Sequence, residues 1–324
     1  MNQIIPTSAN GCIPNVYFMG RWTTQTVESK PAMYTTNLGA QILFEVQNAD
    51  YFTLEAVIKP LSAPQTLSIY IDDELHLTPL TQSKNDFKLS SNQSHIVRIY
   101  FTGNTDQDEI WLGNDGLTIK DITIASGTLA AIKPAGPLVA FIGDSITAGC
   151  WVRSKAPSIG YGADLNYAAQ LSRALDWEDY RIAYSAAGII RYGTGGVPPA
   201  GKFVKYVNFS VKAPRINPDL VLINLGTNDA RYEDDVFEMY FVWFINEVKK
   251  QFPHARIIII TPFNQAHAHV IKNVAKALKI ELIPTLDWVI ETNDEVHPNV
   301  EGSKAISDHL VAWFTEPQNR LQSE

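Results

Sequence analysis

The periodicity of apolar residues changes near residue 130, and this change divides the chain into two parts. Up to about Ala130, apolar and polar residues alternate with a period of two, which is typical of strands with one buried face. After Pro137, short apolar runs alternate with stretches of helical period. The pattern therefore predicts an all-β part followed by an α/β part.

The first part, residues 1–130, is predicted to form a β-sandwich, because several short strands joined by turns pack best as two sheets. Asn114-Asp115-Gly116 is a tight-turn signal that predicts a hairpin between the apolar residues on either side. Two strands are indicated by the following apolar faces: Ile42, Phe44 and Val46; Phe52, Leu54, Ala56 and Ile58.

Residues 131–137 are predicted to be a linker, because two prolines and a glycine cannot continue a β-ladder. In residues 138–324, strand-like and helical patterns alternate, which predicts a parallel sheet covered on both faces. Reactive groups collect at the carboxyl ends of such strands. The predicted strands are 138–142, 180–185, 220–225, 256–261 and 281–286, and the predicted helices are 166–176, 233–252, 270–278 and 300–314.

Composition excludes several classes of function. With 45% hydrophobic and 19% charged residues, the chain is typical of a folded globular protein. The net charge of -8 and the lack of a Lys/Arg-rich run disfavour a nucleic-acid partner. No apolar run approaches the length of a transmembrane helix, so no membrane partner is expected.

The expected location is the cytoplasm. The start of the chain, Met1 to Pro6, lacks a basic segment, and nearby prolines interrupt any apolar stretch, so no signal peptide is predicted. Cys12 and Cys150 are the only cysteines, which excludes a disulfide framework and a cysteine-based metal site.

Ser145 is the candidate nucleophile, because the predicted strand 138–142 runs directly into Gly143-Asp144-Ser145. An isolated Gly-Asp-Ser more often serves as a helix cap than as a catalytic motif. The pattern Gly-x-Ser-x-Gly is also absent, since Thr147 stands two positions after the serine, and this argues against an ordinary α/β-hydrolase.

His297 is the candidate base, and Asp294 is the candidate acid that orients it. An acid three residues before a histidine can reach Nδ1–H within one turn, which leaves Nε2 free to accept the serine proton. Alone, His297 before Pro298 would be read as a turn residue, and Asp294 could instead cap the last helix.

Gly188 and Asn228 follow two other predicted strands and are candidate oxyanion donors. The backbone N–H groups of Ser145 and Gly188 and the side-chain amide of Asn228 would bind the developing negative charge. A glycine lets an acyl oxygen approach the backbone closely. Asp229 is interpreted as a helix cap or as a residue that orients Asn228, in preference to a base.

These blocks, in this order, resemble the SGNH (GDSL-type) hydrolase superfamily. The resemblance implies a flavodoxin-like three-layer domain and ester hydrolysis that needs neither a metal nor another cofactor. It also implies that Ser145 is the nucleophile and His297 the base. The matching blocks are Gly143-Asp144-Ser145, Gly188, Gly226-Thr227-Asn228-Asp229 and Asp294-x-x-His297.

A β-sandwich before such a domain resembles carbohydrate esterase family 2, as do Gly20-Arg21 and the run 143–147. Members of that family deacetylate plant-type polysaccharides, and the resemblance implies a jelly-roll-like accessory domain. Some members replace the triad acid with a backbone carbonyl. Asp294 favours a complete triad here, and the carbonyl remains the alternative.

Three aromatic residues near the blocks, Trp151, Tyr192 and Tyr232, are candidates for a platform that stacks against sugar rings. Packing in the core or between domains is the alternative for each of them. His267 and His269 could form a metal-binding pair, but without a nearby third ligand they are interpreted as a loop and a helix start.

The predicted function is removal of O-acetyl groups from small acetylated carbohydrates through an acyl-enzyme on Ser145. One alternative is a broad carboxylesterase or thioesterase that acts on short or lipid-like acyl chains. A second is a carbohydrate-binding protein with a vestigial hydrolase domain. The presence of Ser145, Asn228 and His297 argues against such decay.

Overall fold

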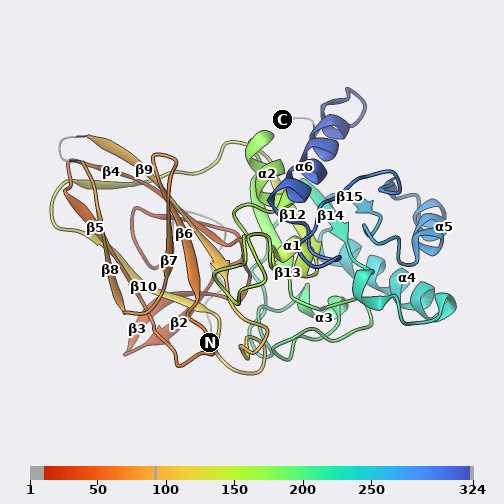
Figure 1. Ribbon diagram of the computed structural model, residues 1–324, viewed down its shortest axis with the longest axis horizontal. Helices are drawn as coiled ribbons and strands as arrows, with labels where there is room; N and C mark the ends of the chain where they lie inside the picture. The colour runs from red at the N-terminus through yellow and green to blue at the C-terminus, as the bar shows by residue number, and fades with distance from the viewer. Residues whose placement is uncertain (1–10, 91–92, 322–324) are drawn as a thin grey trace.

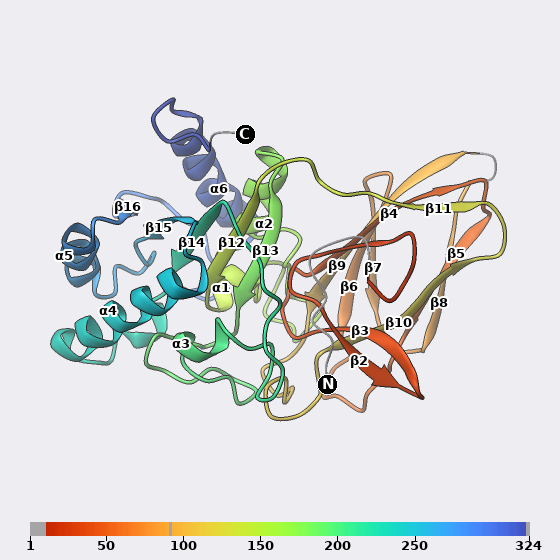
Figure 2. The same cartoon turned by 180° about the vertical axis from the view of Figure 1, so that it is seen from behind.

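The computed structural model describes residues 11–90 and 93–321, and Figures 1 and 2 show its two parts side by side. Met1 to Pro6, on which the prediction of no signal peptide partly rests, lie outside this range. One part consists of antiparallel strands, and the other holds a parallel sheet flanked by helices. The antiparallel strands end at Ala131, and the parallel sheet begins at Leu138.

The antiparallel part is a sandwich of two sheets. One sheet has the order β1-β4-β9-β6-β7 with β11 on β4, and the other has the order β2-β3-β10-β5-β8. Phe44 of the first sheet packs edge-to-face on Phe52 of the second, at 5.4 Å between ring centroids, and both are fully buried. The strands are β1 Tyr17–Met19, β2 Thr23–Val27, β3 Lys30–Thr35, β4 Gln41–Gln47, β5 Tyr51–Ala56, β6 Thr66–Ile71, β7 Glu74–Pro79, β8 Lys84–Lys88, β9 Ser94–Gly103, β10 Leu117–Ile124 and β11 Thr128–Ala131.

Two details of the predicted sandwich are wrong. Ile58 does not share the buried face of its strand, because β5 ends at Ala56 and the Ile58 side chain is exposed. The turn signal 114–116 does not join two strands. Asp115 accepts a hydrogen bond from the Glu109 N–H at 2.8 Å, so the turn closes the long loop between β9 and β10 on itself.

The parallel sheet has the order β13-β12-β14-β15-β16. Gly143, at the end of β12, is in register with Ala183 of β13 and Asn224 of β14, so the carboxyl ends of these strands lie at one edge. β16 is shorter than predicted because Pro284 follows Ile283 and cannot donate to the ladder. The strands are β12 Leu138–Gly143, β13 Glu178–Ala183, β14 Leu220–Asn224, β15 Arg256–Ile260 and β16 Glu281–Ile283.

Helices cover both faces of this sheet (Figure 1). Ala140 and Ile142 pack with residues of α4 and α5 in one buried cluster, whereas Val139 and Phe141 pack with residues of α2 and α6 in another. This alternation follows from the period of two in a strand. The helices are α1 Ser145–Ala148, α2 Tyr167–Ala174, α3 Ala200–Phe203, α4 Asp234–Gln251, α5 Ala268–Leu278 and α6 Val300–Thr315.

Buried polar contacts join the sandwich to the α/β part. The Arg21 guanidinium is fully buried and donates to the carbonyls of Phe203 at 2.8 Å and Val204 at 3.0 Å. The Thr36 hydroxyl donates to the Val207 carbonyl at 2.7 Å. Because buried polar groups are costly to leave unpaired, these contacts hold the two parts in one relative orientation.

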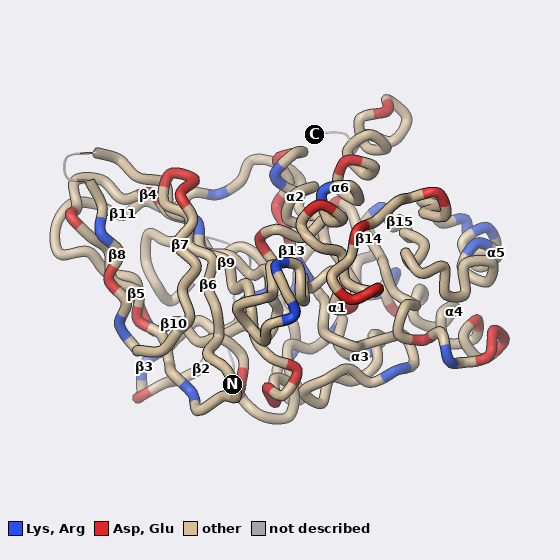
Figure 3. Tube along the Cα trace, viewed as in Figure 1, with Lys and Arg blue, Asp and Glu red and all other residues tan. Residues whose placement is uncertain are grey.

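Charged side chains of both signs are distributed over the whole molecule (Figure 3). Lys and Arg as well as Asp and Glu occur in both parts of the trace, and the formal net charge is -8. Within residues 11–90 and 93–321, no helix is long and apolar enough to cross a bilayer.

Candidate active site

Ser145 is the first residue of α1, directly beyond the carboxyl end of β12. Asp144 caps this helix, since its Oδ1 accepts the Ile146 N–H at 3.0 Å. The helix ends after one turn at Gly149, whose φ of 92° is in the left-handed region that favours glycine. The capping interpretation of Gly-Asp-Ser therefore applies to Asp144, and the role of the adjacent Ser145 as nucleophile stays a prediction.

His297 contacts Ser145 and Asp294 through its two ring nitrogens. Nε2 lies 2.8 Å from Ser145 Oγ, and Nδ1 lies 2.8 Å from Asp294 Oδ2. An ionised carboxylate only accepts hydrogen bonds, so the proton belongs on Nδ1, and Nε2 is then the acceptor for the serine hydroxyl. Asp294 reaches Nδ1 as the three-residue spacing predicts. Ser145 Oγ meets Nε2 although 152 positions of sequence separate Ser145 from His297.

The environment of Asp294 keeps its carboxyl ionised. Partial burial acts to raise its pKa, but hydrogen bonds from the backbone and the ring of His297 outweigh this effect, so the pKa lies below its ordinary value. Asp294 Oδ1 accepts the His297 N–H at 2.7 Å, and Oδ2 faces the ring. One carboxylate thus fixes both the backbone and the imidazole of His297.

Trp151 is the one predicted platform residue whose ring packs against His297. The two rings meet edge-to-face with centroids 4.8 Å apart. Trp151 has a φ of 55°, which is uncommon for a bulky residue. Tyr192 is largely exposed on its loop, and Tyr232 packs under the Arg231 guanidinium. The substrate-binding roles of all three stay predictions.

A cleft of about 320 Å³ lies beside Trp151 and has walls from both parts of the molecule. The α/β part contributes Trp151, Lys155, Pro157 and Tyr161, and the sandwich contributes Ser62, Ala63, Thr105, Asp106 and Gln107. No sequence motif marks the sandwich residues, because they reach the cleft only through long-range packing. Their side chains are mostly polar, which suits a hydroxylated ligand.

Gly188 lies where a side chain would not fit. A Cβ at this position would lie 2.4 Å from Asp229 Oδ1, so any other residue would displace the Asp229 carboxylate. Its N–H donates to the Arg191 carbonyl at 3.0 Å. An incoming oxyanion would have to replace that carbonyl before Gly188 could serve as predicted, and its role as a donor stays a prediction.

The Asn228 amide is held from two sides. Its Nδ2 donates to the Ala187 carbonyl at 3.0 Å, and its Oδ1 accepts from the Arg191 guanidinium at 3.2 Å. One of the two Nδ2 hydrogens is therefore used within the protein, and the other is the one that could bind an oxyanion.

The expectation that Asp229 caps a helix or orients Asn228 is wrong. Its carboxylate accepts three backbone N–H groups from the loop after β13: Ile189 at 2.7 Å, Ile190 at 3.1 Å and Arg191 at 3.0 Å. Burial raises its pKa, and these three donors act against that rise. Asp229 therefore holds the loop that carries Gly188.

Asp144 is a second buried carboxyl near this loop. Burial raises its pKa to about 7; the hydrogen bond from the Ile146 N–H opposes this rise, and the negative charge of Asp229 adds to it. Its Oδ2 is buried and has no hydrogen-bond partner among the described residues. The protonated form of Asp144 is therefore favoured up to neutral pH.

His267 and His269 are both paired with Asp234, at 2.7 and 3.1 Å. His267 precedes the first residue of α5, and its ring stacks on Phe237 at 4.0 Å between centroids. Over the described ranges, no three His, Cys, Asp or Glu side chains have an arrangement that could hold a metal ion. Cys12 and Cys150 are both free thiols.

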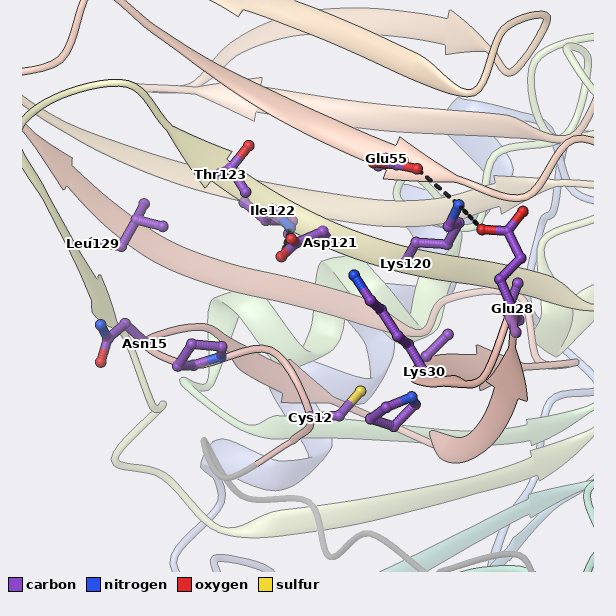
Figure 4. A pocket seen from close by; sticks show the side chains of 14 residues that line it. Cys12, Asn15, Glu28, Lys30, Glu55, Lys120, Asp121, Ile122, Thr123 and Leu129 are labelled. Atoms are coloured by element: carbon purple, nitrogen blue, oxygen red, sulfur yellow. Dashed lines mark hydrogen bonds and ion pairs between the residues drawn. The ribbon is translucent and has the colours of Figure 1, made fainter.

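Another cavity, of about 710 Å³, lies on the sandwich and contains none of the predicted site residues (Figure 4). Lys120 lies between the carboxylates of Glu28 and Glu55, at 2.9 and 2.8 Å. Its lining includes neither Ser145 nor His297, whereas the cleft beside Trp151 is next to His297 through the contact between the two rings.

Comparison with solved structures shows that the two-part fold is shared along nearly the whole chain. A carbohydrate esterase family 2 enzyme plus carbohydrate binding domain from Corynascus thermopiles (Myceliophthora fergusii) is 19% identical, with a TM-score of 0.72 over 92% of this chain and 97% of that chain. A family two carbohydrate esterase from Clostridium thermocellum, in complex with cellohexaose, is 18% identical, with a TM-score of 0.74 over 94% and 99%. An acetyl xylan esterase from the rumen bacterium Butyrivibrio proteoclasticus is 15% identical, with a TM-score of 0.73 over 93% and 94%.

Comparison with known sequences places the α/β part in a family. No curated protein sequence matches the chain at a significant level. The sequence model of the GDSL-like Lipase/Acylhydrolase family matches residues 141–305, slightly more than half of the chain, and this range includes Ser145 and His297. The chain therefore belongs to the GDSL-like lipase/acylhydrolase family and is a carboxylic ester hydrolase.

Proposed function

We propose that this protein is a serine O-acetylesterase that removes acetyl groups from small carbohydrates. The observation that carries the proposal is the position of His297, whose ring contacts Ser145 Oγ and Asp294 Oδ2 at 2.8 Å each. Such a contact allows a neutral serine to attack an ester, because its proton has an acceptor in place.

In the proposed reaction, Ser145 Oγ forms a bond to the acetyl carbonyl carbon while its proton passes to His297 Nε2. The carbonyl oxygen becomes an oxyanion, which hydrogen-bond donors stabilise. The bond from the carbonyl carbon to the sugar oxygen then breaks, and that oxygen takes the proton from His297. Acetyl-Ser145 remains. Water reacts in the same way through His297, which releases acetate and restores the Ser145 hydroxyl.

Two features support a carbohydrate as the alcohol part of the ester. The cleft beside Trp151 combines one indole ring with polar side chains such as Asp106 and Gln107. Aromatic faces and hydrogen-bonding side chains together suit the two kinds of surface of a sugar. The fold is also shared with carbohydrate esterase family 2 enzymes, one of which is in complex with cellohexaose.

A panel of acetylated mono- and oligosaccharides, assayed by acetate release, tests this proposal. We expect turnover of at least one acetylated sugar, and strong preference for acetyl over octanoyl esters of the same alcohol. Equal or faster hydrolysis of octanoyl esters would instead support the broad carboxylesterase or thioesterase. Binding of acetylated sugars without any acetate release would favour a carbohydrate-binding protein.

A further inference from the structure

The loop after β13 presents an arginine to the Asn228 amide. We propose that Arg191 is a positioning residue, whose guanidinium orients and polarises the Asn228 amide so that one Nδ2–H is directed to the substrate carbonyl oxygen. The inference rests on the proposed function and goes beyond it, because it assigns a role to a side chain outside the Ser145, Gly188 and Asn228 set.

The contacts of the Asn228 amide allow one orientation. The Arg191 guanidinium, which can only donate, lies 3.2 Å from Oδ1, and the Ala187 carbonyl, which can only accept, lies 3.0 Å from Nδ2. Rotation of the amide by 180° would place an NH₂ group against a guanidinium and an oxygen against a carbonyl. Both contacts would be repulsive, so Arg191 and Ala187 together fix which atom is free to meet a ligand.

The charge of Arg191 also strengthens the donor. A guanidinium stays protonated under all ordinary conditions, and a hydrogen bond from it to Oδ1 withdraws electron density from the amide. The remaining Nδ2–H then becomes a better donor, since linked hydrogen bonds polarise one another. Arg191 forms no ion pair with any described carboxylate, so no direct partner cancels this effect.

The side chain of Arg191 can be changed without loss of the loop. The loop is held by backbone groups: the Arg191 N–H donates to Asp229 Oδ1 at 3.0 Å, and its carbonyl accepts the Gly188 N–H at 3.0 Å. These bonds do not depend on the side chain. A loss of activity in a side-chain variant can therefore be assigned to the guanidinium when the melting temperature is unchanged.

The test compares Arg191→Met, Arg191→Lys, Asn228→Ala and the double variant Arg191→Met/Asn228→Ala with an acetylated sugar as substrate. Removal of one oxyanion donor costs roughly 100- to 1,000-fold in kcat. We expect Arg191→Met to lose about 10- to 100-fold in kcat with KM within about 3-fold, because the donor remains but is misoriented. Arg191→Lys should recover part of the loss, because one ammonium donor can reach Oδ1.

The double variant separates positioning from general electrostatics. If Arg191 acts through Asn228, adding Arg191→Met to Asn228→Ala should change kcat by less than about 2-fold. Fully multiplicative losses, or an Arg191→Met variant with wild-type kcat, would overturn the inference. Arg215→Met, which removes an exposed arginine, controls for loss of one positive charge. Activity retained by Ser145→Ala would instead overturn the proposed function itself.

Discussion

The side-chain amide of Asn293 donates to the backbone carbonyl of Trp151 at 2.7 Å, across 142 residues of sequence. It also donates to the Val152 carbonyl at 3.1 Å. This contact ties the loop that carries Asp294 and His297 to the loop that follows Ser145 and α1. His297 is therefore held from two directions, by a carboxylate at Nδ1 and by an indole against its ring.

Replacement of Ser145 or His297 by alanine should abolish acetate release and leave the melting temperature within about 2 °C. Each side chain is small or lies at the edge of the core, and the two act as one unit in catalysis. Acetate release and thermal melts of the same preparations check this expectation. A Ser145→Ala enzyme that keeps more than about a hundredth of the wild-type rate would refute the assignment.

Asp294→Asn should reduce kcat less than His297→Ala does. An asparagine can still accept the His297 N–H, but it cannot stabilise the imidazolium that forms when Ser145 attacks. Steady-state kinetics of the two variants side by side measure the difference. Wild-type activity in Asp294→Asn would mean that a backbone carbonyl orients the histidine, as in the alternative drawn from the family resemblance.

The contact between His297 and Asp294 could be predicted from the sequence because it is local. The two residues are three positions apart, and the turn between them leaves few other arrangements. The position of Ser145 could also be predicted, because an apolar strand that ends on Gly-Asp-Ser places the serine at the carboxyl end of a parallel sheet. In both cases one short segment carries the whole signal.

The contacts of Arg191, Asp229 and Asp106 could not be predicted in the same way. Arg191 meets Asn228 across 37 residues, and Asp229 accepts three N–H groups from a loop in which no residue type signals that contact. Asp106 lines the cleft from the sandwich side. Its Oδ1 accepts a hydrogen bond from Thr194 of the α/β part at 3.2 Å. Such contacts depend on how loops from different strands pack, and composition and periodicity do not encode that.

Trp151→Ala should impair the hydrolysis of sugar esters more than the hydrolysis of small aryl esters. The indole ring lines the cleft and packs on His297, so its loss removes both a stacking surface and a support for the base. We expect KM for an acetylated oligosaccharide to rise about 10-fold or more, because stacking on an aromatic ring is lost. Hydrolysis of 4-nitrophenyl acetate should fall less. Equal losses on both substrates would assign Trp151 to support of His297 alone.

Asp144→Asn should change the pH dependence of stability. The pKa of Asp144 is raised to about 7, chiefly by burial, so the folded protein keeps this proton while the unfolded chain releases it near its ordinary value of 3.8. The contribution of this group to the free energy of unfolding is fully present below pH 3.8, and it is lost as the pH rises from there to about 7. Asparagine keeps an acceptor for the Ile146 N–H and cannot ionise.

The melting temperature of Asp144→Asn relative to wild type should therefore increase between pH 5 and pH 8. Differential scanning calorimetry at several pH values in that range measures the difference. A constant offset at all pH values would show that Asp144 does not titrate in this window and that the variant only alters packing.

The sandwich should contribute to substrate binding and not to the chemical step. Removal of residues 1–130 is a poor test, because the Phe203 and Val204 carbonyls that Arg21 binds would lose their buried partner.

Substitution of Gln107 is a better test of the role of the sandwich, since the Gln107 side chain is exposed and lines the cleft beside Trp151. We expect Gln107→Ala to raise KM for an acetylated oligosaccharide several-fold, because a hydrogen-bonding group is lost, while 4-nitrophenyl acetate hydrolysis stays unchanged. Gln82→Ala, an exposed glutamine of the sandwich outside the cleft lining, is the matched control. If the Gln107 and Gln82 variants both match wild type on oligosaccharides, this wall of the cleft does not bind the sugar.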